Sequence, residues 1–146
     1  MNELIKLSLS EAGVVSILEP VGLLLEGGKR PEGATVMPFE AGLPMAWDAT
    51  IIHTCAPSYL HKTSVSPGSG AAAAEDRKAA KYSSLAGRVR FRAVAIETVG
   101  AFGPSARELF EGIAENIISF QRHWCENPSV QTRRGSRPDG ELCVHF

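Results

Sequence analysis

An alanine-rich helix followed by an apolar strand is the sequence feature that most restricts the fold of this chain. Residues 71–86 begin with four alanines and are followed by Gly87. Alanine has the highest helix propensity, and glycine is favoured just after a helix ends. Residues 89–99 come next, and their continuously apolar second half, 93–96, is typical of a strand that is buried on both faces.

Two further strands are predicted before this helix, at residues 34–39 and 45–52. Both segments contain β-branched and aromatic residues, and residues 40–44 between them contain the turn formers glycine and proline. Pro38 lacks an amide hydrogen, which places it at a strand end or on an edge strand. The two strands are therefore expected to form a β-hairpin.

Helices are also predicted at both ends of this region. Residues 9–19 have an amphipathic pattern that Ser10 caps and Pro20 ends. Residues 105–124 carry an apolar stripe at helical spacing. Residues 56–70 are rich in Pro, Gly, Ser and Thr, so they are expected to form a loop. The stripe of the last helix consists of Leu109, Phe110, Ile113, Ile117 and Phe120.

The predicted order is helix, strand, strand, helix, strand, helix. This order indicates a mixed α/β fold in which helices flank a small central sheet. A length of 146 residues suits one hydrophobic core. Residues 1–124 are therefore expected to form a single domain, and the polar residues 125–146 a loosely ordered tail.

The composition argues against several classes of protein. No apolar run reaches the roughly 18 residues of a transmembrane helix, and the first residues lack the basic segment of a secretory signal. The three cysteines lie far apart, which is typical of a reducing compartment, so the nucleus or cytoplasm is the expected location. The net charge of −1 gives no overall attraction for nucleic acid. Any such contact would depend on local clusters, which are also compatible with a solvated surface: Lys29 and Arg30; Arg88, Arg90 and Arg92; Arg133, Arg134 and Arg137.

Two carboxylates are candidates for binding a divalent cation. Glu32 precedes the first strand of the predicted hairpin, and Asp48 lies in the middle of the second. A hairpin brings such positions together, and Mg²⁺ needs only one or two protein carboxylates when water and phosphate complete its coordination. A buried Asp48 would need a partner, whereas on the exposed face of an edge strand it would not. The sequence is compatible with both placements.

The alanine-rich helix supplies positive charge. Lys78 and Tyr82 lie four residues apart on one face, and Lys81 is three residues after Lys78. An ammonium group near a scissile phosphate would stabilise developing charge or orient the attacking water, although lysines on such helices are usually solvated. Glu97 follows the buried part of its strand, where it would support the site, cap the next helix or pair with Arg107.

These residues belong to an ordered series that resembles a domain encoded by retrotransposon-derived reading frames of animals, near reverse-transcriptase modules. The resemblance covers roughly residues 12–122. That domain in turn is similar, in its order of elements and a few polar positions, to the PD-(D/E)XK, or restriction-endonuclease-like, nuclease superfamily. The matching residues are Gly28–Gly33, Trp47–Thr50, Ala56–Tyr59, Ala73–Glu75, Lys78, Lys81, Tyr82, Ala95–Gly100, Gly103 and Pro104.

The resemblance implies Mg²⁺- or Mn²⁺-dependent hydrolysis of phosphodiester bonds, with DNA as the expected substrate and RNA as an alternative. Glu32 would stand at the Asp of the Pro-Asp motif, and Asp48 at the acidic position of (D/E)XK. Both would bind the metal, and Ala49 would lend its backbone carbonyl. The resemblance thus assigns a metal site to the predicted hairpin.

Two departures from the motif leave a catalytically inactive module for binding nucleic acid or protein as the alternative function. Glu32 stands where the motif has Asp, and Thr50 stands where it has Lys. The catalytic ammonium would then come from Lys78 or Lys81, and the Lys78–Tyr82 pair resembles the Gln-x-x-x-Tyr helix of the RecB-like and lambda-exonuclease-like branches. The residues expected to support the metal ligands are Thr50, Tyr82 and Glu97.

Other interpretations have weaker support. Structural zinc sites take four ligands from close pairs such as Cys-x₂-Cys, a spacing that is absent here. A Cys–His nucleophile would require a strand-to-helix elbow that no cysteine occupies. An α/β binding domain unrelated to nucleases is a third function, and the sequence allows a homodimer without specifying one. The His–Cys pairs concerned are His53 with Cys55, His123 with Cys125, and Cys143 with His145.

Overall fold

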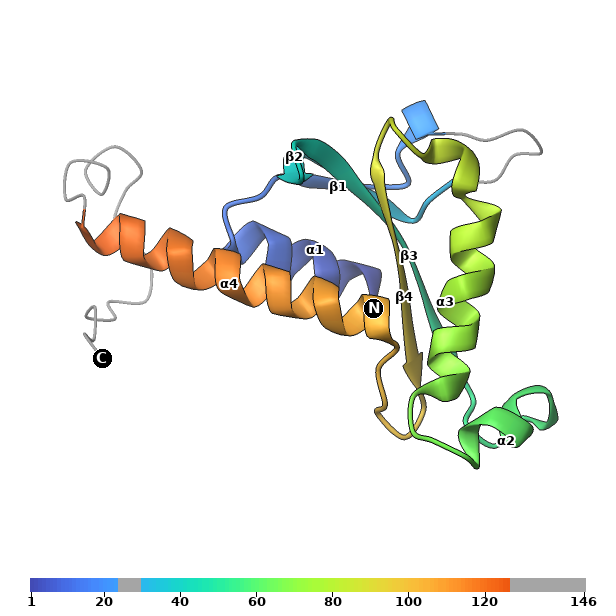
Figure 1. Cartoon of the computed structure of the whole chain (residues 1–146). Helices are drawn as coiled ribbons and strands as arrows, with labels where there is room; N and C mark the ends of the chain where they lie inside the picture. The colour runs from blue at the N-terminus through green and yellow to red at the C-terminus, as the bar shows by residue number, and fades with distance from the viewer. Residues whose placement is uncertain (24–29, 127–146) are drawn as a thin grey trace.

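The computed structural model describes residues 1–23 and 30–126 and contains one four-stranded sheet in the order β1-β2-β3-β4 (Figure 1). The first three strands are antiparallel neighbours: β1 (Ser16–Leu18), β2 (Gly33–Glu40) and β3 (Leu43–Ile52). The last strand, β4 (Arg90–Glu97), runs parallel to β3. The predicted mixed α/β fold is confirmed, with one strand, β1, more than expected.

The predicted hairpin is formed by β2 and β3. Ala41 and Gly42 at its tip have φ angles of 49° and 75°. Two consecutive residues with positive φ are what the tightest hairpin turn requires, and they match the right-handed twist of the strands. Pro38 lies beyond the part of β2 that pairs with β1, where its missing amide hydrogen leaves no gap in that ladder.

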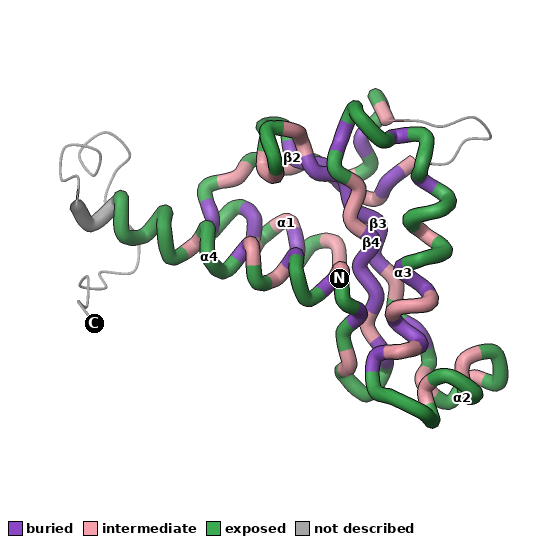
Figure 2. The backbone as a smooth tube through the Cα atoms, viewed as in Figure 1, coloured by how far each residue is buried: buried purple, intermediate pink, exposed green. Residues whose placement is uncertain are grey.

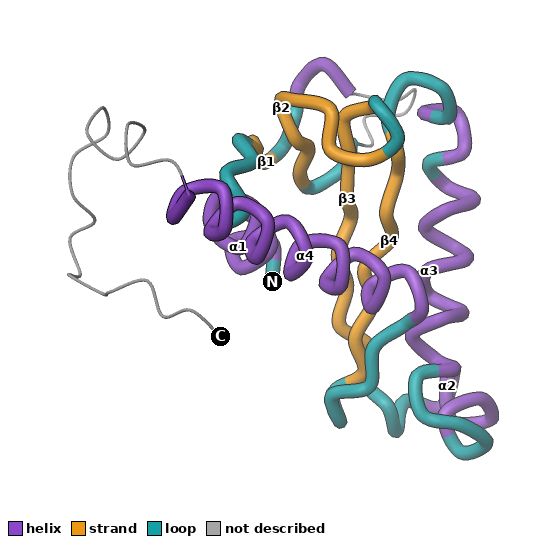
Figure 3. Tube along the Cα trace, turned by 60° about the vertical axis from the view of Figure 1, so that its left-hand side comes forward, coloured by secondary structure: helices purple, strands orange, loops and turns teal. Residues whose placement is uncertain are grey.

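Helices cover both faces of the sheet. α1 (Asn2–Glu11) and α4 (Pro104–Glu126) lie side by side on one face, and α3 (Ser69–Lys81) lies on the other, as Figures 1 and 3 show. α3 also provides the crossover that a parallel connection between β3 and β4 needs. α2 (Pro57–Thr63) packs beside α3.

The two faces of β3 belong to two different parts of the core. Side chains alternate along a strand, so Met45, Trp47 and Ala49 pack with α1 and α4. Ala46 and Ile52 point the other way and belong to the clusters beneath α3. Figure 2 shows the buried residues concentrated along β3 and β4, between the two helical layers. The same alternation places Asp48 on the α3 side.

The predicted helix at residues 9–19 is wrong. The helix is α1 (Asn2–Glu11), and Ser16–Leu18 form β1 instead. Gly13 has φ of 74°, a left-handed conformation that ends the helical path and suits glycine. The segment after it gains backbone hydrogen bonds from β2, which local periodicity could not reveal.

Other boundaries also differ from the prediction. The expected loop at residues 56–70 contains α2, because Pro57 is well suited to the first position of a helix. The helix predicted at residues 71–86 is α3, which starts earlier, at Ser69, and ends at Lys81. A short 3₁₀ helix, η2 (Ser83–Leu85), follows it. Another 3₁₀ helix, η1 (Val21–Leu23), lies between β1 and β2.

The C-terminal tail predicted at residues 125–146 begins inside the last helix. Residues 125 and 126 belong to α4. Residues 127–146 lie outside the described part of the chain, as do the basic cluster of Arg133, Arg134 and Arg137 and the pair of Cys143 with His145. Among the helices described, none has the length and apolar character needed to cross a membrane.

Candidate functional site

Asp48 is a buried carboxylate on an interior strand. Its residue is only 4% exposed, and β3 lies between β2 and β4. The alternative placement on the exposed face of an edge strand is therefore wrong. The Nζ atom of Lys78 donates a hydrogen bond to Asp48 Oδ1 at 2.8 Å, and Lys81 Nζ lies 3.6 Å from Oδ2. Two ammonium groups thus face one carboxylate.

Small residues bring the lysine-bearing helix close to the sheet. Ala71 and Ala74 of α3 are buried in a cluster with Ile52 of β3 and Ala95 of β4. Side chains four residues apart on a helix share a face, so Lys78 points toward the sheet one turn after Ala74. The alanines that predicted the helix therefore also set the distance from which Lys78 reaches β3.

Glu32 lies beside Asp48 on the neighbouring chain segment. The last pair in the β2–β3 register is Gly33 with Trp47, so Glu32 and Asp48 are the next residues on the two sides. The Glu32 amide donates to Trp47 O at 2.9 Å, and Glu32 Oε2 accepts the Ala49 amide hydrogen at 2.7 Å. The hairpin thus brings the two predicted acidic residues together.

The donor set at this point suits a hard cation. The N–H and C=O groups of one strand residue point to the same edge, so the Ala49 carbonyl faces the edge along which Glu32 lies. Two carboxylates and a carbonyl supply the oxygen ligands that Mg²⁺ prefers, with water and phosphate for the remaining positions. Within residues 1–23 and 30–126, no group of three or more His, Cys, Asp or Glu side chains could hold a metal by itself.

Tyr82 connects the end of α3 to the segment that carries Glu32. Its hydroxyl donates to the carbonyl of Arg30 at 2.8 Å, and its ring packs 4.5 Å from that of Phe91. Burial raises the pKa of the Tyr82 hydroxyl, and the nearby carboxylates of Asp48 and Glu32 raise it further. Tyr82 therefore stays protonated and keeps its hydrogen to donate.

Glu97 is not part of this cluster. Its Oε1 accepts the amide hydrogens of Gly70 and Ala71 at 3.1 and 3.4 Å, which caps the start of α3 rather than the helix that follows it. Glu97 pairs with Ile52, four residues along β3 from Asp48, and so lies roughly 13 Å from it at the usual strand rise. Thr50, two residues from Asp48, is half-buried on the same side of β3.

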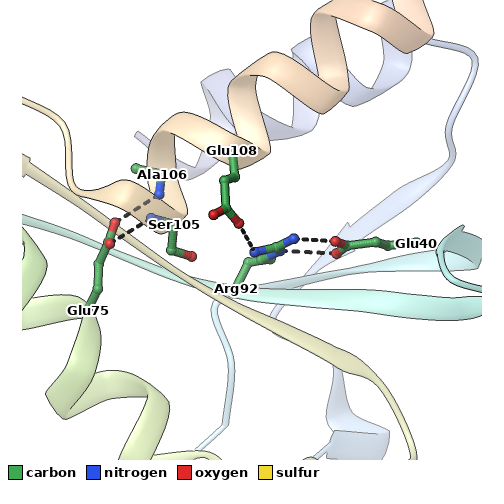
Figure 4. Close-up of polar contacts among 6 residues, drawn as sticks. All are labelled: Glu40, Glu75, Arg92, Ser105, Ala106 and Glu108. Atoms are coloured by element: carbon green, nitrogen blue, oxygen red, sulfur yellow. Dashed lines mark hydrogen bonds and ion pairs between the residues drawn. The ribbon is translucent and has the colours of Figure 1, made fainter.

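Glu75 is a buried carboxylate to which the sequence analysis assigned no role. Its two oxygens accept the amide hydrogens of Ser105 and Ala106 at 2.9 Å each (Figure 4). One of them also accepts the amide hydrogen of Ala95 at 3.2 Å. Burial raises the pKa of Glu75, although these hydrogen bonds oppose that shift. Gly103 lies against the carboxyl group of Glu75. The Gly103-Pro104 pair at the start of α4 was therefore the sequence signal that could have pointed to this contact.

A second polar group fastens the opposite side of the sheet. The guanidinium of Arg92 on β4 pairs with Glu40 at the end of β2, and donates to Glu108 of α4 at 2.7 Å (Figure 4). Of the basic cluster Arg88, Arg90 and Arg92, Arg92 is thus half-buried in an ion-pair network. Glu75 joins α3 to β4 and to the start of α4, and Arg92 joins β4 to α4, so both roles are structural.

An open depression lies next to Glu32. Asn2, Leu18, Glu19 and Glu32 line it, and its volume is about 420 Å³. The Oδ1 atom of Asn2 is buried without a hydrogen-bond partner in the described part of the chain, and Arg30 pairs with Glu19 nearby. Glu32 is therefore accessible from this side, whereas Asp48 is covered by α3.

Comparison with known proteins identified no relative. No family model matches the chain, and neither the curated proteins nor the solved structures contain a significant match.

Proposed function

We propose that this domain is a metal-dependent nuclease that hydrolyses phosphodiester bonds of DNA in a retroelement context, within the nucleus or cytoplasm. One observation carries the proposal. Glu32 and Asp48 lie next to each other where the hairpin pairs β2 with β3, and Lys78 approaches Asp48 from α3. Carboxylates, a strand carbonyl and an ammonium group within one cluster are the parts that phosphodiester hydrolysis requires.

In this proposal, one set of residues binds the cation and another contacts the phosphate. Glu32, Asp48 and the Ala49 carbonyl would hold Mg²⁺ or Mn²⁺, which supplies Lewis-acid polarisation of a phosphoryl oxygen. Lys78 or Lys81 would stabilise the negative charge that develops on the phosphate or orient the attacking water. Tyr82 would keep the segment before Glu32 against α3 through its bond to the Arg30 carbonyl.

The order of elements from β2 to β4 adds support. A hairpin, an alanine-rich helix and a further strand follow one another as the resemblance to the PD-(D/E)XK nucleases implies. Asp48 lies on β3, Glu32 directly precedes β2 and the two lysines lie on α3, an arrangement that supports the proposal.

A catalytically inactive module with this fold is the second candidate function. Both oxygens of Asp48 face a lysine, and an ion pair of this kind also fastens a helix to a sheet without any chemistry. Thr50 in place of the motif's lysine favours the same interpretation. Such a module would bind nucleic acid or protein.

Metal-dependent cleavage distinguishes the two functions. Purified protein would be incubated with plasmid, single-stranded DNA and RNA, each with Mg²⁺ or Mn²⁺, and compared with Asp48→Ala and with the exposed control Glu115→Ala. The nuclease requires metal-dependent cleavage that Asp48→Ala abolishes and Glu115→Ala retains. Equal cleavage by the wild type and Asp48→Ala would remove the assignment, and DNA left intact while RNA is cut would change the substrate.

A further inference from the structure

Two lysines compete for one buried carboxylate, and their positions differ in a way that assigns them different roles. Lys78 donates to Asp48 Oδ1 at 2.8 Å, and its side chain is 21% exposed. Lys81 lies 3.6 Å from Oδ2, beyond the normal range of a hydrogen bond, and its side chain is 36% exposed. Lys81 is also the last residue of α3, so it is held to the helix on one side only.

One carboxylate, that of Asp48, lies within ion-pair range of two ammonium groups. The ammonium of Lys81 lies 4.5 Å from the centre of the Tyr82 ring, a weak attraction that holds it near the carboxylate without neutralising it. A group held this loosely is able to exchange Asp48 for another anion.

We infer that Lys81 is a phosphate-binding side chain that Asp48 holds in reserve, and that it is released when Asp48 takes part in binding a divalent cation. This inference rests on the proposed function and extends it to the coupling between the cation and the substrate. A cation at Asp48 repels the nearby ammonium groups, and Lys81 is the one with the longer contact and the easier path to solvent. Released at the end of α3, its ammonium is directed to a phosphate of the nucleic acid strand.

The coupling is reciprocal. If cation binding frees Lys81, then removing the Lys81 charge must strengthen cation binding by the same free energy. Lys78 would keep its place, because it makes the shorter contact and is less exposed. Lys81 therefore differs from a lysine that only stabilises the fold, since its loss improves one binding event and weakens another.

Calorimetric titration with Mn²⁺ tests the first half of this inference. The proteins are the wild type, Lys81→Gln and the matched control Arg77→Gln, which removes a positive charge from the same helix at a residue that contacts Tyr59 instead of Asp48. Lys81→Gln is expected to bind Mn²⁺ at least about fivefold more tightly than the wild type, the low end of typical coupling, and Arg77→Gln within about twofold.

Binding of a single-stranded oligonucleotide tests the second half. With Mn²⁺ present, a charged phosphorothioate strand should bind Lys81→Gln several-fold more weakly than the wild type, and an uncharged methylphosphonate strand should bind both equally. An unchanged Mn²⁺ affinity in Lys81→Gln, or equal gains in Lys81→Gln and Arg77→Gln, would overturn this inference alone. If the wild type and Asp48→Asn bound Mn²⁺ equally weakly, the proposed function would fail and the inference with it.

Discussion

The ammonium group of Lys78 lies 2.8 Å from Oδ1 of Asp48, and this ion pair joins α3 to the interior strand β3. It connects a helix recognisable from its alanines to the one acidic residue inside an apolar strand. The pair should therefore contribute to the free energy of unfolding, which is measurable without any assay of activity.

The first prediction concerns the free energy of this ion pair. A double-mutant cycle with Asp48→Asn and Lys78→Met should give a coupling free energy of about 1–3 kcal/mol, because the carboxylate is buried and the contact is short. The same cycle with Lys81→Met should give a smaller coupling of about 1 kcal/mol, the upper end for exposed pairs. Urea denaturation measures both, and a larger coupling for Lys81 would contradict this ranking.

The second prediction uses two glycines near α4. A Cβ atom on Gly103 would lie 2.3 Å from the carboxyl carbon of Glu75, whereas one on Gly112 would meet nothing within 4 Å. Gly103→Ala should therefore destabilise the protein by about 1–3 kcal/mol. Gly112→Ala, in the interior of the helix, should instead stabilise it by about 0.5–1 kcal/mol. Thermal and urea unfolding would show the two opposite signs, and equal effects would refute the packing argument.

The third prediction concerns pH. Burial raises the pKa of Glu75 above its ordinary value, so the folded protein holds this proton more tightly than the unfolded chain. Stability from this group is fully present below the unfolded pKa and is lost as pH rises through the folded pKa. The free energy of unfolding of the wild type, minus that of Glu75→Gln, should fall as the pH is raised from about 4. Urea denaturation across this range checks it, and a difference that rises with pH would reverse the assignment.

The fourth prediction tests the link made by Tyr82. Tyr82→Phe removes the hydrogen bond to the Arg30 carbonyl and should lower the free energy of unfolding by about 0.5–1.5 kcal/mol. It should also weaken Mn²⁺ binding, since the segment before Glu32 is then less firmly held. Tyr59→Phe is the matched control, because the Tyr59 hydroxyl contacts only the exposed Arg77 among the hydrogen bonds described. Equal Mn²⁺ affinity in all three proteins would rule out this role.

The fifth prediction separates the helix cap from the candidate site. Glu97→Ala leaves the amide hydrogens of Gly70 and Ala71 without their acceptor, which should cost about 0.5–2 kcal/mol. Because Glu97 lies far along β3 from Asp48, the variant should bind Mn²⁺ as the wild type does while it remains folded. Calorimetry below the unfolding transition measures this. A loss of Mn²⁺ affinity in Glu97→Ala would show that Glu97 takes part in the candidate site.

Local sequence was sufficient for the elements whose signals lie within a few residues. The hairpin was predictable because β-branched strands flank a turn at Ala41 and Gly42, and the last two helices and β4 followed from propensity and periodicity. It also identified Asp48, because a charged side chain in an apolar strand needs a partner. Glu32 and Lys78 were identified from their positions before the hairpin and on the alanine-rich helix.

Tertiary structure alone decided where these residues meet. The register of β2 against β3 places Glu32 beside Asp48. The close packing of α3 against the sheet brings Lys78 within hydrogen-bond distance of Asp48. It also made residues 16–18 a strand and Glu97 the cap of α3, against local expectation. The physical reason is that helix propensity and periodicity depend on neighbours in sequence, whereas strand pairing, burial and charge pairing depend on groups that only the folded chain brings together.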